Sequence, residues 1–253
     1  MTSRRLPRFG ALALVLALLI SARPASAADV QVAVAANFTE PAKKIADAFA
    51  AKTGDHALLS FGSSGQFYTQ IAHGAPFEVF LSADADRPAQ AEKEGLGVAG
   101  TRFTYAIGRL VLFSKTEGLV DAKGAVLKAG KFEKLAIADP TTAPYGAAAV
   151  QTMTKLGVYD ALQPKLVKGT SITQAYQFTE TGAAELGFVA LSQVVNETGG
   201  SRWLVPEADH TPIDQQAILL TTGAADPVAK AFLAFLKGSE ARKIIKSYGY
   251  EAK

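Results

Sequence analysis

Hydrophobic and polar residues alternate along the stretch 29–36, where valine occupies every second position from Val30 to Val34. Such period-two alternation with β-branched residues predicts a β-strand. Further along, short apolar runs alternate with segments in which apolar residues recur every three or four positions, the spacing of a helix face. The pattern predicts strands over 29–36, 56–61, 79–81, 134–138, 165–168 and 186–191, and helices over 39–53, 67–73, 88–95, 147–156, 172–181, 227–237 and 239–248.

Two longer extended runs, at 101–114 and 213–221, interrupt this order. The first is broken only by Gly108-Arg109, so it is either one kinked strand or a crossover between two lobes. Strands that alternate with helices predict an α/β fold whose largely parallel sheets carry helices on their faces. Two lobes suit the chain better than one sheet of ten or more strands. We predict a first lobe from 28–108 plus 213–253, a second lobe from 109–212, and a ligand in the cleft between them.

The first 27 residues have the three parts of a secretory signal peptide. Arginines at positions 4, 5 and 8 precede an uncharged apolar run over 11–20, and Ala25-Ser26-Ala27 predicts cleavage after Ala27. The run is too short to span a bilayer; a buried N-terminal helix is the alternative. The paired arginines leave the twin-arginine export route open, although the general secretory route is favoured. We therefore expect a periplasmic protein.

The formal net charge of +3 resides in that leader. Its removal takes away four Arg and no acidic residue, and leaves 226 residues with 22 basic and 23 acidic side chains. No Lys/Arg cluster then remains to neutralise the phosphates of a duplex, which excludes nucleic acid as a partner. The lack of Cys excludes disulfides, thiol nucleophiles and Cys-ligated metals. We expect a monomer without a cofactor.

Four short loops share one pattern, in which a strand ends, small or hydroxylic residues turn the chain, and a helix begins. Ser, Thr and Asn cap helices routinely, so capping alone explains any one of them. Helix N-termini also present unpaired N–H groups and the positive end of the helix dipole, so two such loops in each lobe favour an anion site. The loops are Ala35-Ala36-Asn37-Phe38, Gly62-Ser63-Ser64-Gly65, Ala143-Pro144-Tyr145-Gly146 and Ser171-Ile172-Thr173.

None of these loops contains Lys, Arg, His, Asp or Glu. Neutral donors would bind a doubly negative anion without titrating, and would discriminate between anions by donor geometry and cavity size. The lack of an acceptor carboxylate disfavours a protonated anion such as hydrogen phosphate, whose O–H needs a partner.

Motifs of an enzyme are few. The chain has no G-x-S-x-G, H-E-x-x-H or Walker A motif. Asp84 and Asp86 could act with a His as acid and base or as metal ligands, but a helix-capping Asp86 beside a structural or solvent-facing Asp84 is the simpler interpretation. We predict a binding protein with no catalytic residue, and keep a secreted hydrolase as the alternative from another class.

Several motifs along the mature chain carry a family resemblance when they are taken together. They include Phe61-Gly62-Ser63-Ser64-Gly65, Gly74-Ala75-Pro76-Phe77, Leu81-Ser82-Ala83-Asp84 and Asp139-Pro140 followed by Ala143-Pro144-Tyr145-Gly146. With them the sequence resembles the periplasmic molybdate-binding proteins that serve ABC transporters. The resemblance implies a two-lobed periplasmic binding-protein fold of type II, in which each lobe is a mixed, mostly parallel sheet flanked by helices.

The resemblance also implies a set of hydrogen-bond donors for molybdate or tungstate, with the metal held as its oxyanion. Asn37 would contribute its side-chain amide and backbone N–H, and Ala36 a backbone group. Ser64 would contribute its hydroxyl and its N–H. From the second lobe, Tyr145 and Ile172 would donate their backbone N–H groups.

Two positions depart from the common family pattern. Many members have Ser where Asn37 stands, and many have a ligand-bonding Tyr where Ala190 stands, so we expect Tyr145 to compensate for that missing hydroxyl. The implied function is the capture of molybdate and tungstate in the periplasm for import through an ABC-transporter permease. The nearest alternative is the same fold with another tetrahedral oxyanion, such as sulfate.

Overall fold

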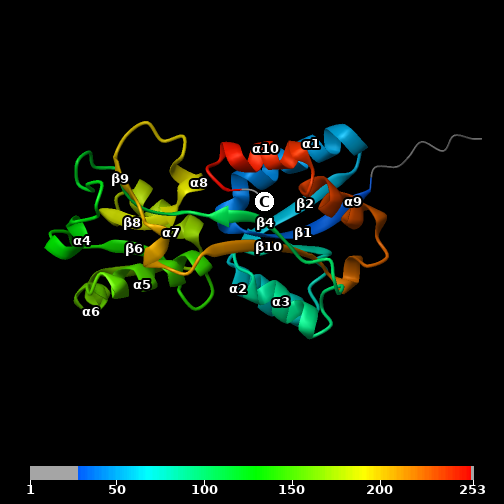
Figure 1. Ribbon diagram of the computed structural model, residues 1–253, viewed down its shortest axis with the longest axis horizontal. Helices are drawn as coiled ribbons and strands as arrows, with labels where there is room; N and C mark the ends of the chain where they lie inside the picture. The colour runs from blue at the N-terminus through cyan, green and yellow to red at the C-terminus, as the bar shows by residue number, and fades with distance from the viewer. Residues whose placement is uncertain (1–27, 252–253) are drawn as a thin grey trace, which may run out of the picture.

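The structure, a computed structural model, describes residues 28–251 as two α/β lobes that lie side by side along the longest axis of the molecule (Figure 1). The predicted signal peptide, residues 1–27, lies outside the described residues. Within 28–251, no helix is long and apolar enough to cross a membrane.

The first lobe, called lobe I, is built on a five-stranded sheet of order β2-β1-β3-β10-β4. Strand β1 pairs in parallel with β2 and β3, whereas β10 pairs antiparallel with both β3 and β4. All strands but β10 therefore point in one direction. The strands are β1 (Asp29–Ala35), β2 (His56–Gly62), β3 (Val79–Leu81), β4 (Phe103–Gly108) and β10 (Ile213–Leu219).

Helices cover both faces of this sheet (Figure 1). The valines of β1 point to the face covered by α1, α9 and α10, where Val32 packs in one apolar cluster with Phe49 and Phe232. Ala33 points to the opposite face and packs with Phe67 of α2. The period-two pattern of β1 therefore places its valines on one buried face of the sheet and Ala33 on the other, which is also buried. The helices are α1 (Thr39–Thr53), α2 (Ser64–Ala72), α3 (Asp86–Lys93), α9 (Pro227–Leu236) and α10 (Ser239–Ser247).

The second lobe, lobe II, repeats this design with a sheet of order β7-β6-β8-β5-β9. Here β6 pairs in parallel with β7 and β8, and β5 runs antiparallel to β8 and β9. The strands are β5 (Leu110–Ser114), β6 (Leu135–Ala138), β7 (Leu166–Gly169), β8 (Leu186–Ala190) and β9 (Ser201–Leu204). The helices are α4 (Val126–Ala129), α5 (Pro144–Lys155), α6 (Tyr159–Leu162), α7 (Ile172–Glu180) and α8 (Leu191–Val194).

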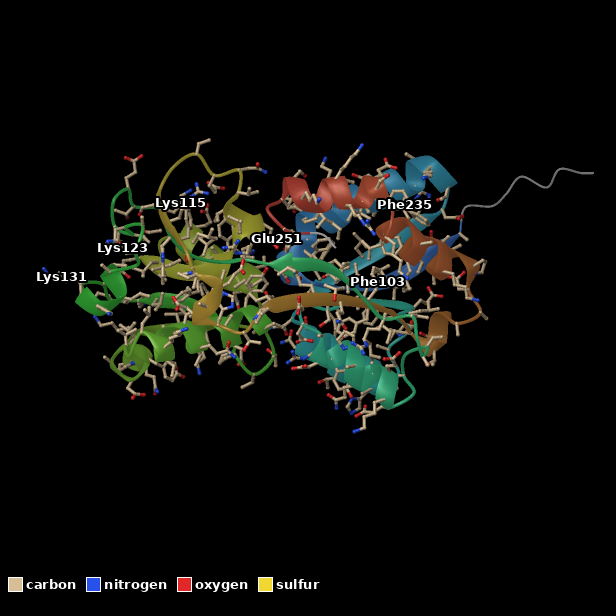
Figure 2. All side chains as sticks on the ribbon, viewed as in Figure 1. Phe103, Lys115, Lys123, Lys131, Phe235 and Glu251 are labelled. Carbon is tan, nitrogen blue, oxygen red and sulfur yellow. The ribbon has the colours of Figure 1, made fainter. Side chains whose placement is uncertain are left out.

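The chain crosses between the lobes twice, at Gly108–Leu110 and again between β9 and β10. The extended run 101–114 is therefore a crossover, with β4 in one sheet and β5 in the other. The strand that enters each lobe from its neighbour, β5 or β10, is the reversed strand of that sheet. The C-terminal segment returns to this junction. There Glu251 forms an antiparallel β-bridge with Ile107 and lies between the lobes (Figure 2).

The structure differs from the predicted elements mainly in where some helices begin and in a few very short elements. Helix α5 begins at Pro144 rather than at residue 147, because proline suits the first turn of a helix, where no N–H partner is needed. The four-residue elements α4, α6, α8 and β9 were not predicted, since they are too short to establish a period. The described part of the chain also contains four short 3-10 helices: η1 (Ala36–Phe38), η2 (Gln163–Lys165), η3 (Glu207–Asp209) and η4 (Thr221–Gly223).

Candidate functional site

The structure brings all five predicted site residues to one small cavity between the lobes. Ala36, Asn37 and Ser64 reach it from lobe I, and Tyr145 and Ile172 reach it from lobe II. The centre of a water-sized sphere can move through about 10 Å³ of the cavity. No lining residue carries a charge. The other lining residues are Ala35, Gly62, Ser63, Ala83, Ala143 and Pro144.

The cavity lies where strands end and helices begin. In lobe I, β1 and β2 lead directly into η1 and α2, and in lobe II, β6 and β7 lead through short loops into α5 and α7. The carboxyl ends of parallel strands meet at one edge of a sheet, which brings these helix starts together. The N–H groups of a first helical turn have no partner inside the helix, and the dipole adds partial positive charge there. Such an arrangement favours an anion.

The side chain of Asn37 points into lobe I and not freely into the cavity. Its amide nitrogen donates to Gln215 Oε1 at 2.7 Å and to the Tyr250 hydroxyl at 2.9 Å. Both amide hydrogens are therefore engaged, so the predicted donation from this amide to a ligand does not fit the arrangement. The backbone N–H of Asn37 is the donor that remains for the cavity.

The carbonyl of Asn37 is held as firmly as its side chain. It accepts hydrogen bonds from the Tyr250 hydroxyl and from the Ser192 hydroxyl of lobe II, both at 2.8 Å. Sequence patterns did not indicate Gln215, Tyr250 or Ser192, because each lies more than 150 residues from Asn37 in the chain. In the structure these three residues stand out as polar side chains that are buried: Gln215 is 0% exposed, Tyr250 5% and Ser192 8%.

Ser64 and Tyr145 contribute differently to the cavity. The Ser64 hydroxyl accepts from the Ala83 N–H at 2.9 Å, which leaves its own hydrogen free to donate. The Tyr145 hydroxyl is buried without a hydrogen-bond partner; Tyr250 and Asn37 lie beside it, but neither meets it at hydrogen-bonding geometry. Burial raises the pKa of Tyr145 well above its usual value, and the neighbouring Tyr250 raises this pKa further. The cavity therefore carries no group that titrates near neutral pH.

Direct contacts hold the lobes together around the cavity. The Gly65 N–H donates to the Thr142 carbonyl at 2.8 Å, and Arg87 Nη2 donates to the Thr141 carbonyl at 3.2 Å. On the other side, Thr173 Oγ1 donates to the Ala36 carbonyl at 3.3 Å. These contacts keep the two lobes together on both sides of the cavity.

The two aspartates considered for catalysis lie outside this cavity. Asp84 pairs with the Arg87 side chain and accepts the Arg87 backbone N–H at 3.0 Å, so Asp84, and not Asp86 as expected, satisfies the start of α3. Both aspartates line a separate groove that no histidine lines. Within residues 28–251, no cluster of three or more His, Asp or Glu could hold a metal ion.

Two lobes that enclose a small, uncharged cavity between helix starts define a two-lobed solute-binding protein. The model of the family described as bacterial extracellular solute-binding protein matches residues 30–251. The molybdate-binding protein ModA of Rhodobacter capsulatus is 60% identical over 240 residues, which cover 95% of this chain and 94% of that protein. ModA of Azotobacter vinelandii is 58% identical over 229 residues, covering 89% and 91%.

A solved structure agrees with these relatives. The periplasmic molybdate-binding protein of Azotobacter vinelandii superposes with a TM-score of 0.86 at 42% identity, covering 88% of this chain and 99% of that one. The chain belongs to the ModA family of bacterial extracellular solute-binding proteins.

Proposed function

We propose that the protein captures molybdate, and also tungstate, in the periplasm and delivers it to the membrane permease of an ABC transporter. The observation that carries this proposal is the cavity itself, which is uncharged, buried, and lined by the N-terminal turns of α2, α5 and α7 together with η1. Its relatives in Rhodobacter capsulatus and Azotobacter vinelandii are molybdate-binding proteins.

The size and chemistry of the cavity together support a small oxyanion. The centre of a water-sized sphere can move through only about 10 Å³ of the cavity, so the space between the lobes as they stand suits a compact ligand rather than a sugar, an amino acid or a peptide. Backbone N–H groups and the Ser64 hydroxyl are donors, which suits a ligand that only accepts hydrogen bonds. A fully deprotonated tetrahedral oxyanion is such a ligand.

We propose that the leader predicted over residues 1–27 is cleaved off during export. The Ala28 nitrogen lies 3.2 Å from Asp55 Oδ1. Cleavage after Ala27 would make this nitrogen an ammonium group facing a carboxylate, a favourable pairing at an exposed end. Mass spectrometry of the protein secreted to the periplasm should find Ala28 as its first residue; retention of residues 1–27 would contradict the proposed processing.

Calorimetric titration of the purified mature protein tests the ligand. Molybdate and tungstate should bind with 1:1 stoichiometry, and sulfate in excess should fail to displace them. Ser64→Ala removes one donor to a charged acceptor, and should weaken binding by the order of 1.5–3 kcal/mol. Ser60→Ala, on the preceding strand and outside the cavity, is the matched control and should bind as the wild type does. Preferential binding of sulfate would replace the proposed ligand.

A further inference from the structure

Ser63, which precedes Ser64 in the chain, has a buried hydroxyl that meets no hydrogen-bond partner. The residue is only 4% exposed, so water does not satisfy this hydroxyl from the bulk solvent. Most buried polar side-chain atoms in native proteins have a partner, and an orphaned one calls for an explanation.

The position of Ser63 makes the missing partner unexpected. Ser63 is the N-cap of α2 and has extended backbone angles, φ −76° and ψ 146°, the conformation in which a capping serine accepts an N–H from the first turn. Its side chain makes no such bond. By contrast, the Ser171 hydroxyl at the N-cap of α7 accepts the Gln174 N–H at 3.3 Å, and Asp226 caps α9 through two N–H groups.

The uncapped hydroxyl belongs to a residue that lines the cavity between the lobes. Its neighbour Ser64 already uses a lone pair for the Ala83 N–H, whereas the Ser63 hydroxyl is uncommitted both as donor and as acceptor. The two hydroxyls therefore differ: one is oriented by the protein, and the other is left to be oriented by whatever occupies the cavity.

We propose that the Ser63 hydroxyl donates a hydrogen bond to the bound oxyanion, as a ligand-contacting residue in addition to Ser64. This inference rests on the proposed function, because it needs an anion in the cavity. The anion supplies an acceptor for the Ser63 hydroxyl, which the start of the helix does not. This bond to the anion explains why the Ser63 side chain does not cap α2. Ser63 then contributes to affinity and not to the stability of the ligand-free fold.

Ser63→Ala separates these two contributions. A donor to a charged acceptor corresponds to roughly a 10- to 150-fold change in the dissociation constant, and we expect the variant to bind the anion more weakly by that factor. Without ligand, the melting temperature should be unchanged or higher, since the substitution removes a buried hydroxyl that has no partner. A serine with only a structural role would give the reverse: a lower melting temperature and an unchanged dissociation constant.

Asp226→Ala is the control for capping, because Asp226 does cap its helix and lies outside the cavity. It should lower the melting temperature and leave the dissociation constant unchanged. The wild type is first titrated with molybdate, tungstate, sulfate and phosphate, and the variants with whichever anion binds. Binding of sulfate alone would overturn the proposed ligand but still allow Ser63 to be tested; no binding of any anion, or equal affinity in Ser63→Ala, would overturn the Ser63 contact.

Discussion

Gly65→Ala should impede closure of the lobes without harming either lobe. Gly65 is the second residue of α2, and its N–H donates to the Thr142 carbonyl across the cleft at 2.8 Å. A Cβ built at Gly65 would lie 2.9 Å from both Thr142 Cα and the Thr142 carbonyl oxygen. Both of these atoms belong to the backbone of lobe II, so no side-chain rotation can relieve the overlap.

The size of the effect follows from that geometry. Ordinary contacts of a Cβ begin at about 3.4 Å, so the lobes must separate by about 0.5 Å at this point. Such overpacking costs about 1–3 kcal/mol, and it acts only on the closed arrangement. Alanine within a helix is about 0.5–1 kcal/mol more stable than glycine, and this gain applies to lobe I whether or not the lobes are closed. A penalty of 1–3 kcal/mol on closure corresponds to roughly 5- to 150-fold weaker binding.

Calorimetric titration measures the penalty on closure, and thermal unfolding without ligand measures the stabilisation of lobe I. The variant should show a larger dissociation constant for the anion, and a ligand-free melting temperature equal to or above that of the wild type. Gln66→Ala, at the next and exposed position of the same helix, is the matched control and should change neither quantity appreciably. Unchanged affinity in Gly65→Ala would refute the argument that this contact limits closure, and a lower ligand-free melting temperature would show damage within lobe I.

Three further predictions concern the residues around the cavity. Tyr250→Phe orphans an amide hydrogen of Asn37 and should lower the free energy of unfolding in urea by about 1–3 kcal/mol. Anion affinity, followed by titration calorimetry, should stay constant between about pH 6 and pH 9, because burial raises the pKa of Tyr145 well above that interval and no other lining residue titrates. Hydrogen bonds from the Thr141 backbone and hydroxyl lower the pKa of Asp139 below 3.8, so its contribution to stability is present above that pH and is lost as the pH falls through the lowered pKa. The difference in urea stability between the wild type and Asp139→Asn should accordingly shrink in acid.

The broad design of the fold was predictable because it depends on local patterns. The alternation over 29–36 and the helix spacing that follows predict β1 and α1 to within a residue. The two extended runs also indicated a chain that crosses between lobes. Loops between a strand and a helix were recognisable from small and hydroxylic residues, and the ends of parallel strands bring such loops together. The five candidate residues consequently lie around one cavity.

The orientation of individual side chains was not predictable from those patterns. Asn37 was expected to direct its amide to the ligand, but Gln215 and Tyr250 take both amide hydrogens. These partners come from β10 and from the C-terminal segment, and only the folded chain brings them within reach. The assignment of the cap to Asp86 rather than Asp84 was wrong for a related reason, since it depends on where α3 begins to within one or two residues.

Contacts from lobe II also reach the anion-facing loop of lobe I. The Ala36 carbonyl accepts from Thr173, and the Asn37 carbonyl accepts from Ser192, both of which belong to lobe II. Within lobe I, the Ala36 carbonyl also accepts the Thr39 hydroxyl at 2.8 Å and the Thr39 N–H. In a trans peptide the C=O of one residue and the N–H of the next point in opposite directions, so these bonds set the direction of the Asn37 N–H, and the longer bond from Thr173 adds to them. Closure of the lobes therefore does more than cover the ligand, because it adds a hydrogen bond to the peptide that carries this donor of the opposite lobe. Affinity and closure should accordingly change together in variants of Thr173.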